Sequence, residues 1–146
     1  MVTRTSDDDR KQIVNMVREF IKRDVEPIAS VYDNEDIYPH ELIPKMQELG
    51  LFGITIPREY GGLELDFTTF AMIFEEMSKG WMSLSGIIGT HHVLSHIVSN
   101  YGTQSQKDDV LPRMATGELR GGLALTEPEA GSDAQNISTV AKKDGE

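Results

Sequence analysis

The stretch SLSGIIGTHHVLSHIVSN, residues 83–100, decides the fold of this chain. Its apolar side chains are not confined to one stripe but cover much of the circumference of a helix. These positions are Leu84, Ile87, Ile88, Leu94, Ile97 and Val98. A helix that is apolar on most sides has to be enclosed by other elements. The stretch therefore predicts a buried central helix within a mainly α structure.

Two amphipathic helices are predicted at the start of the chain. Residues 6–26 place apolar side chains at three- and four-residue steps with charges between them, and Pro27 ends or bends this helix. Residues 39–49 repeat the pattern, and Gly50 stands where the second helix stops. The apolar positions are Ile13, Val17, Phe20, Ile21 and Val25 in the first helix, and Leu42, Ile43, Met46 and Leu49 in the second.

A packed connector and a third helix are predicted before the central helix. Residues 51–62, LFGITIPREYGG, are apolar at first and then rich in turn formers. Asp66 is the predicted N-cap of the third helix, because its carboxylate can accept hydrogen bonds from the free N–H groups of the first turn. The apolar stripe of this helix is assigned to the core and comprises Phe67, Phe70, Ala71, Phe74 and Met77.

The pattern of the chain changes near residue 120. Thr103 and Gln106 form a capping box that opens a fifth helix, predicted to break at Pro112 and to be followed by a short turn that ends near Gly117. Beyond it, residues 121–126 and 137–141 are predicted strands, and the Asp-Gly pair within residues 142–146 is typical of a hairpin turn.

These patterns predict a helical bundle domain over residues 1–119 and the first strands of a β domain over residues 120–146. A hairpin arm without partner strands is marginally stable at best. We therefore expect the chain to be a truncated part of a longer protein.

Composition and charge exclude several classes of function. The 146 residues carry 24 acidic and 14 basic side chains, and the net charge of −10 makes nucleic acid an improbable partner. The absence of cysteine excludes disulfides and thiol nucleophiles. No run approaches the about 18 consecutive apolar residues of a membrane span. Residues 1–10 have the features of neither a secretory signal nor a transit peptide, so a bacterial cytoplasm and a mitochondrial matrix after processing fit equally well.

The most specific stretch for function is LALTEPEAGSD, residues 123–133. It is predicted as a strand end that leads into a loop. Thr126 and Ser132 offer hydroxyl groups, and Gly131 permits a close approach of the backbone. Such loops can hold phosphates or polar ring edges through backbone N–H groups, although an ordinary strand-to-loop connector has the same composition.

This stretch resembles the signature of the acyl-CoA dehydrogenase family, in which two apolar residues flank a variable one and precede Thr-Glu-Pro and Gly-Ser-Asp. Residues 50–62 are similar to the connector of the family's helical domain. Residues 101–107, together with residues 111–118, are similar to its approach to the flavin loop. The resemblance extends over roughly residues 13–146, with the three motifs in the family's order and spacing.

The resemblance implies FAD as the cofactor and a role for five residues in binding it. In the family, the residues that match Leu123, Leu125 and Thr126 lie against the flavin ring, with the threonine hydroxyl near the reactive N5 side. The residues that match Gly131 and Ser132 lie at the diphosphate, and the serine also approaches the acyl-CoA substrate.

The resemblance also implies the reaction and the partners. Family members carry out α,β-dehydrogenation of acyl-CoA thioesters, in which a carboxylate removes the α-proton and hydride passes from the β-carbon to flavin N5. Electrons then go to an electron-transfer flavoprotein, and the enzymes are homo-oligomers, tetramers or dimers. The base comes from a carboxy-terminal domain that has no match here. We therefore expect no catalytic residue in this chain, no turnover by the chain alone, and weak or no retention of FAD.

Several other polar residues are candidates for a site. In the family the central helix helps to line the acyl cavity, so Gly89 and His91, together with Gly86 and Thr90, are candidate substrate contacts, although core packing is the favoured interpretation. His92 and His96 have the spacing of two metal ligands but no evident third, so no metal site is predicted. Glu127 and Glu129 are rejected as bases, because exposed loop carboxylates are ordinarily solvated. Trp81 is assigned to packing.

Three other functions share some of these features. A non-catalytic subunit of a heteromeric dehydrogenase would supply the flavin loop to a partner. An acyl-CoA oxidase would share the loop and admit oxygen to the reduced flavin. A helical interaction module without enzymatic function is the fourth interpretation.

Overall fold

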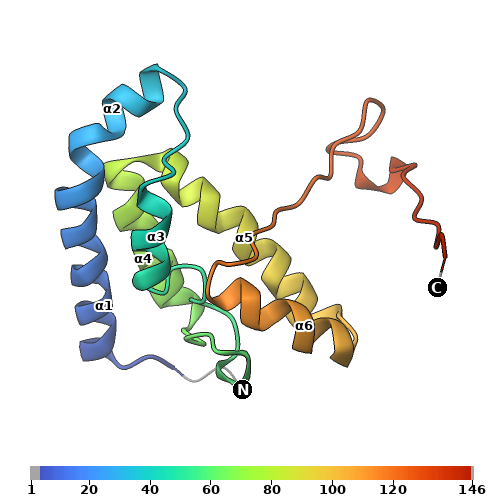
Figure 1. Cartoon of the computed structure of the whole chain (residues 1–146), viewed down its shortest axis with the longest axis horizontal. Coiled ribbons are helices and arrows are strands. Elements are labelled where there is room, and N and C mark those ends of the chain that lie inside the picture. The colour runs from blue at the N-terminus through green and yellow to red at the C-terminus, as the bar shows by residue number, and fades with distance from the viewer. Residues whose placement is uncertain (1–3, 146) are drawn as a thin grey trace.

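The structure is a computed structural model that describes residues 4–145. Its helices and helical turns, labelled in part in Figure 1, are α1 (Asp7–Phe20), the π-helical segment η1 (Ile21–Val25), α2 (Glu26–Asn34), α3 (Leu42–Glu48), the 3-10 turn η2 (Arg58–Tyr60), α4 (Phe67–Gly80), α5 (Met82–Tyr101), α6 (Gln104–Ala115) and the 3-10 turn η3 (Ala134–Asn136).

The helices form a bundle in which α1 packs on α4, α4 on α5, and α5 on α6. The main core lies where α1, α3, α4 and α5 meet the connector of residues 51–56, and the predicted packed connector is confirmed there. Its fully buried side chains include Phe20, Met46, Phe52, Ile54, Ile73, Met77, Leu84 and Ile88. A smaller core under α6 is formed by Ile56, Leu111, Met114 and Ala115. The prediction of a mainly α structure is confirmed.

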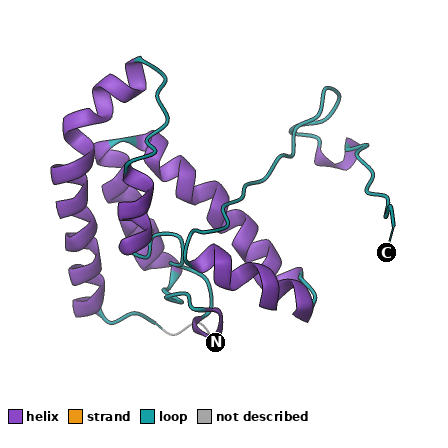
Figure 2. Ribbon diagram, viewed as in Figure 1, coloured by secondary structure: helices purple, strands orange, loops and turns teal. Residues whose placement is uncertain are grey.

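The predicted strands are wrong for this structure. Figure 2 shows helices and loops, and within residues 120–145 the pairing of strands is limited to one antiparallel bridge between Glu127 and Ala130. Residues 121–126 and 137–141 have no neighbouring strand to pair with, so their alternating pattern does not become a sheet. Nor does the Asp-Gly pair close a hairpin, although Gly145 has a φ of 92°, and Glu146 lies outside the described residues.

The first predicted helix is longer than expected. The helical path continues through Pro27, which occupies the first turn of α2, where a missing N–H is tolerated. The wide π-helical turn η1 precedes the proline, and the path bends between α1 and α2 (Figure 1). The bend that the sequence predicted is therefore confirmed, whereas an end at Pro27 is not. The second predicted helix, in contrast, is shorter, because α3 begins at Leu42 and not at Pro39.

Pro112 does not break the fifth helix, which corrects another expectation. It lies inside α6, which continues to Ala115. The proline cannot donate to the carbonyl oxygen of Asp108, but both residues are exposed, so water can satisfy that carbonyl. The predicted caps are confirmed: Asp66 accepts from the Thr69 N–H at 2.8 Å, and Thr103 and Gln106 form a capping box.

Trp81 is a packing anchor, as predicted. It is buried between α4 and α5, and its ring meets the Tyr32 ring edge to face with centroids 6.1 Å apart. The indole N–H donates to the carboxylate of Asp33 at 2.9 Å, which satisfies the one polar atom of the ring. Trp81 thereby ties the junction of α4 and α5 to α2.

Candidate functional site

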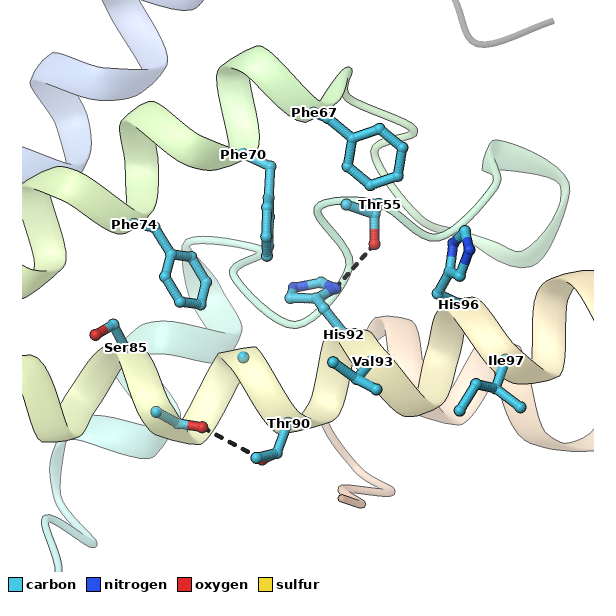
Figure 3. Close-up of a pocket in the computed structure, with 12 residues that line it drawn as sticks. Thr55, Phe67, Phe70, Phe74, Ser85, Thr90, His92, Val93, His96 and Ile97 are labelled. Atoms are coloured by element: carbon cyan, nitrogen blue, oxygen red, sulfur yellow. Dashed lines mark hydrogen bonds between the residues drawn. The ribbon is translucent and has the colours of Figure 1, made fainter. Parts of the chain in front are cut away.

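A groove of about 600 Å³ lies between α4 and α5. Figure 3 shows aromatic rings from α4 on one side and the exposed face of α5 on the other. Most of the surface is apolar, and the polar side chains are placed singly along it. The lining residues are Thr55, Phe67, Phe70, Phe74, Ser85, Gly86, Gly89, Thr90, His92, Val93, His96 and Ile97.

The wall on α4 corrects a sequence prediction. Phe67, Phe70 and Phe74 were assigned to the core, but all three line the groove: Phe67 is 62% exposed, whereas Phe70 and Phe74 are half-buried and also pack against the core. Met77, the last residue of the predicted stripe, is buried in the core together with Thr69, Ile73 and Glu76, whereas Ala71 is exposed. Helical spacing places the three rings on one face, but it does not tell whether a neighbouring element closes over that face. Here none of the described residues does.

The floor on α5 is opened by two glycines. A Cβ atom at Gly86 would meet no heavy atom within 4 Å, whereas one at Gly89 would lie 3.1 Å from Cζ of Phe74. The Thr90 hydroxyl donates to the carbonyl of Gly86 at 3.2 Å, so its polar atom is turned back to the helix. Of the predicted substrate contacts, Gly86, Gly89 and Thr90 line the groove.

His91 does not line the groove, although it was a candidate substrate contact. It is 1% exposed and faces the connector, where its Nε2 donates to the carbonyl of Phe52 at 3.0 Å. Burial lowers the pKa of His91, because the charged form would lose its hydration. Core packing, which the sequence favoured, describes this residue.

His92, the next residue, lines the groove instead. Its Nε2 donates to the carbonyl of Leu51 at 2.9 Å, so the neutral ring accepts at Nδ1 from the hydroxyl of Thr55 at 3.0 Å. Burial lowers the pKa of His92 to about 4. The two ring nitrogens are thus both in use, and His92 is not oriented as a metal ligand with the exposed His96. Within residues 4–145 no cluster of three His, Cys, Asp or Glu residues could hold a metal ion.

A second, more open cavity of about 730 Å³ adjoins the groove. Gly86 and Thr90 line both, and the second cavity extends to residues 118–122. The backbone passes close to α5 there: a Cβ at Gly121 would lie 2.3 Å from Cδ2 of Leu94. The cavity therefore connects the floor of the groove to the start of the predicted flavin loop.

The predicted flavin-binding residues lie on an exposed arm that leaves the helical bundle (Figure 1). Leu123 and Leu125 are 51% and 45% exposed, Thr126 and Ser132 are exposed, and Gly131 is half-buried. These five residues line neither cavity, so the structure does not bring them to the groove.

The backbone of this arm offers polar groups that could hold a cofactor. Residues 121–126 make no backbone hydrogen bond to another described residue, so their N–H and C=O groups are available to a ligand. The hydroxyl groups of Thr126 and Ser132 are likewise without a partner in the described residues. A planar ring with alternating donors and acceptors suits such a segment, because unpaired backbone groups then gain partners.

Sequence reasoning expected the carboxylate of Glu127 to be solvated, but the structure gives it partners within the arm. Its carboxylate accepts from the backbone N–H and the hydroxyl of both Ser138 and Thr139. These hydrogen bonds lower the pKa of Glu127 to about 2. The signal available in the sequence is a Ser-Thr pair eleven and twelve residues beyond a loop carboxylate, which does not by itself indicate a contact.

Several known proteins that resemble this chain are enzymes that act on acyl-CoA compounds. Residues 7–118 match the family described as Acyl-CoA dehydrogenase, N-terminal domain. The acryloyl-CoA reductase (NADH) of Anaerotignum propionicum is 36% identical over 138 residues, which are 94% of this chain and 35% of that protein. The acyl-CoA dehydrogenase of Bacillus subtilis (strain 168) is 36% identical over 132 residues, 89% of this chain and 35% of the relative.

Solved structures agree with the sequence comparison. Butyryl-CoA dehydrogenase from Megasphaera elsdenii superposes with a TM-score of 0.85 at 26% identity, over 95% of this chain and 37% of that one. The chain thus spans about a third of the length of the relatives that it matches. No helix among the described residues is long and apolar enough to cross a bilayer. The match over residues 7–118 and the likeness of the fold show that this chain belongs to the acyl-CoA dehydrogenase family.

Proposed function

We propose that this chain forms the amino-terminal part of a flavin-dependent acyl-CoA dehydrogenase, in which the groove between α4 and α5 receives the acyl chain. The observation that carries the proposal is the groove itself. Its volume of about 600 Å³ lies in the range of ligand pockets, and its walls are aromatic and aliphatic. An acyl chain gains free energy when it leaves water for such a surface, by roughly 0.8 kcal/mol for each buried methylene.

Residues 123–132, the first part of the arm, are proposed as the cofactor segment. Leu123, Leu125 and Thr126 would lie along the ring of FAD, and Gly131 and Ser132 at its diphosphate. The support is that the arm offers unpaired backbone groups and free hydroxyls without any basic side chain between residues 121 and 141. Ser132 is also proposed to approach the acyl-CoA.

FAD, when bound, would supply the acceptor for the hydride that leaves the β-carbon of the thioester. The residues of this chain would orient the two reactants and exclude water between them. None is assigned as the base that removes the α-proton. Glu127 is unsuited to that role, because four hydrogen bonds occupy its carboxylate and lower its pKa to about 2, which makes it a weak proton acceptor. The base, the electron-transfer flavoprotein and a homo-oligomeric assembly belong to the proposal for the whole enzyme.

A second candidate is the reverse reaction, the reduction of an enoyl-CoA. A relative that matches 94% of this chain is named acryloyl-CoA reductase (NADH), which favours it. Both directions use the same acyl groove and the same ring position. They are distinguished by whether the holoenzyme that contains this chain oxidises butyryl-CoA with an electron-transfer flavoprotein as acceptor or reduces crotonyl-CoA with NADH. An acyl-CoA oxidase would instead form hydrogen peroxide.

The proposal is tested by titrating the chain with CoA, butyryl-CoA, octanoyl-CoA and palmitoyl-CoA in a calorimeter. The affinity is expected to rise with the length of the acyl group, because each added methylene is buried in the groove. Equal affinities for all four compounds would overturn the assignment of the groove. The chain alone is expected to give no acyl-CoA-dependent dye reduction, and measurable turnover would overturn the placement of the base outside it.

A further inference from the structure

The arm of residues 123–145 is held together by one side chain. Within these described residues every hydrogen bond made by a side chain ends on the carboxylate of Glu127. One carboxylate oxygen accepts from the N–H and the hydroxyl of Ser138, both at 2.9 Å. The other accepts from the N–H of Thr139 at 2.9 Å and from its hydroxyl.

Glu127 also closes a tight turn through its backbone. Its N–H donates to the carbonyl of Ala130 at 2.7 Å, and the N–H of Ala130 donates back at 3.2 Å. Gly131 follows this turn directly, and a Cβ on it would lie 3.6 Å from Cγ2 of Thr126. One residue therefore closes both the short turn and the wider loop from residue 127 to residue 139.

The residues proposed to hold the cofactor lie on both sides of this closure. Thr126 precedes Glu127, and Gly131 and Ser132 lie within the loop. No sheet pairing among the described residues holds Thr126, Gly131 or Ser132 in place. The nearest tie to the helical bundle lies just before the arm, where Arg120 donates to the hydroxyl of Tyr38 at 3.0 Å. Without the carboxylate, the two halves of the loop would have to be ordered by the ligand, which would weaken binding.

We propose that Glu127 is the positioning residue of the flavin loop. Its carboxylate clamps Ser138 and Thr139. Thr126, Gly131 and Ser132 thereby keep the arrangement that the ring and the diphosphate of FAD require. The inference rests on the proposed function, since it names the device that orders the same site. It also explains how an acidic residue is compatible with an anionic ligand nearby: four donors occupy the carboxylate and direct its charge to the far end of the loop.

The loop offers a matched control. Glu129 is two residues away and exposed, and its carboxylate makes no hydrogen bond to a described residue. Glu127→Gln and Glu129→Gln therefore remove the same charge from the same loop, but only the first removes an oxygen that accepts hydrogen bonds from Ser138 or Thr139. Thr139→Val and Thr139→Ser form a second pair, since serine keeps the hydroxyl that valine lacks.

The first measurement is amide hydrogen exchange of Ser138 and Thr139 by NMR in the chain itself, near neutral pH. Glu127→Gln and Thr139→Val are expected to accelerate exchange at both amides, whereas Glu129→Gln and Thr139→Ser are expected to leave it near the wild-type rate. Unchanged exchange in Glu127→Gln would overturn the clamp, whatever the protein does with flavin.

The second measurement is a titration of the same variants with FAD, followed at the amides of Gly131 and Ser132. Weak binding by the wild-type chain is expected, reduced roughly tenfold in Glu127→Gln, the scale of effect seen when a supporting contact of a ligand site is lost. If wild type and Glu127→Gln bind equally, the positioning role is wrong although the flavin loop stands. If the wild-type amides do not respond to FAD, the flavin loop is wrong and positioning for flavin fails with it, while the exchange data still decide the clamp.

Discussion

The hydroxyl oxygen of Thr55 lies 3.0 Å from Nδ1 of His92, and this contact joins the connector to the central helix at the edge of the groove between α4 and α5 (Figure 3). The same imidazole donates from Nε2 to the carbonyl of Leu51. A neutral ring makes both hydrogen bonds at once, whereas a protonated ring has two donors and cannot accept from the threonine. The contact therefore couples the charge of His92 to the packing of α5.

Stability is expected to decrease as the pH falls from about 6.5 to about 4. Burial lowers the pKa of His92 to about 4 from the ordinary value of 6.5, so between these values the unfolded chain binds a proton that the folded chain does not. The effect approaches roughly 3 kcal/mol, because each pH unit of the shift corresponds to 1.36 kcal/mol. His91, whose pKa is also lowered by burial, contributes with the same sign.

Urea unfolding at about pH 7.5 and about pH 5 measures this effect. His92→Gln is expected to be less stable than wild type at the higher pH and to lose less stability between the two. His96→Gln is the control, since His96 is exposed on the same helix, and it should keep the wild-type dependence. An equal loss in wild type and His92→Gln would contradict the prediction.

A second window is expected at lower pH from Glu76. Arg18 binds this carboxylate through two N–H groups, each at 2.9 Å, and Lys79 adds a third contact at 3.0 Å. These contacts lower the pKa of Glu76 to about 2 from 4.5, so the stabilisation is complete above about pH 4.5 and is lost as the pH falls towards 2. Thermal unfolding of wild type and Glu76→Gln should therefore converge at acid pH.

At neutral pH, Glu76→Gln is expected to cost about 2 kcal/mol, since it weakens hydrogen bonds between charged groups at a buried position. Glu75→Gln is its matched control. Glu75 is adjacent in sequence and pairs with the same lysine at 2.9 Å, but its side chain is 64% exposed, so its loss should cost less than about 1 kcal/mol. Equal losses for the two variants would show that burial of Glu76 is not what matters.

The sequence predicts a structural feature well when that feature depends on neighbouring residues alone. The central helix was expected over residues 83–100 and is α5, Met82–Tyr101, because a long periodic pattern needs no information from elsewhere. The hydrogen-bond partners of its buried histidines were not predicted. The partners of His91 and His92 are carbonyls 39 and 41 residues away, and nothing in the pattern of the helix reports on them.

The candidate site was predicted less completely for the same reason. Gly86, Gly89 and Thr90 were expected near an acyl cavity and line the groove, but the rings of Phe67, Phe70 and Phe74 opposite them were assigned to the core. Whether an apolar face is covered depends on tertiary packing. Strands were also expected beyond residue 120, but they do not form. A sequence that favours a strand becomes one only where a partner strand is present to pair with it.

The open floor of the groove predicts opposite effects on stability and on binding at Gly86. Gly86→Ala and Gly86→Leu should each stabilise α5 by about 0.5–1 kcal/mol, because glycine is a poor helix former. Alanine leaves the groove nearly unchanged, since its Cβ would contact nothing within 4 Å. Leucine fills the space of one or two methylenes, so palmitoyl-CoA affinity should fall by about fourfold to fifteenfold. A calorimetric titration in which both variants bind like wild type would contradict this.

The turn after α6, which directs the chain towards the arm, is expected to tolerate no side chain at Gly117. Its φ of 74° is costly for any other residue, and a Cβ there would lie 2.5 Å from Cδ2 of Phe52, a buried ring that cannot yield. Gly61 has a similar φ of 82° but nothing within 4 Å of its Cβ position. Gly61→Ala should therefore lower the free energy of unfolding only through the backbone angle, by about 1 kcal/mol, and Gly117→Ala should lower it by at least about 2 kcal/mol more.

Urea unfolding of the two variants measures the difference. Adding Phe52→Leu to each should restore part of the lost stability in Gly117→Ala only. If Phe52→Leu lowers the stability of both backgrounds equally, the overlap with the ring is not the cause, and the backbone angle alone makes Gly117 necessary.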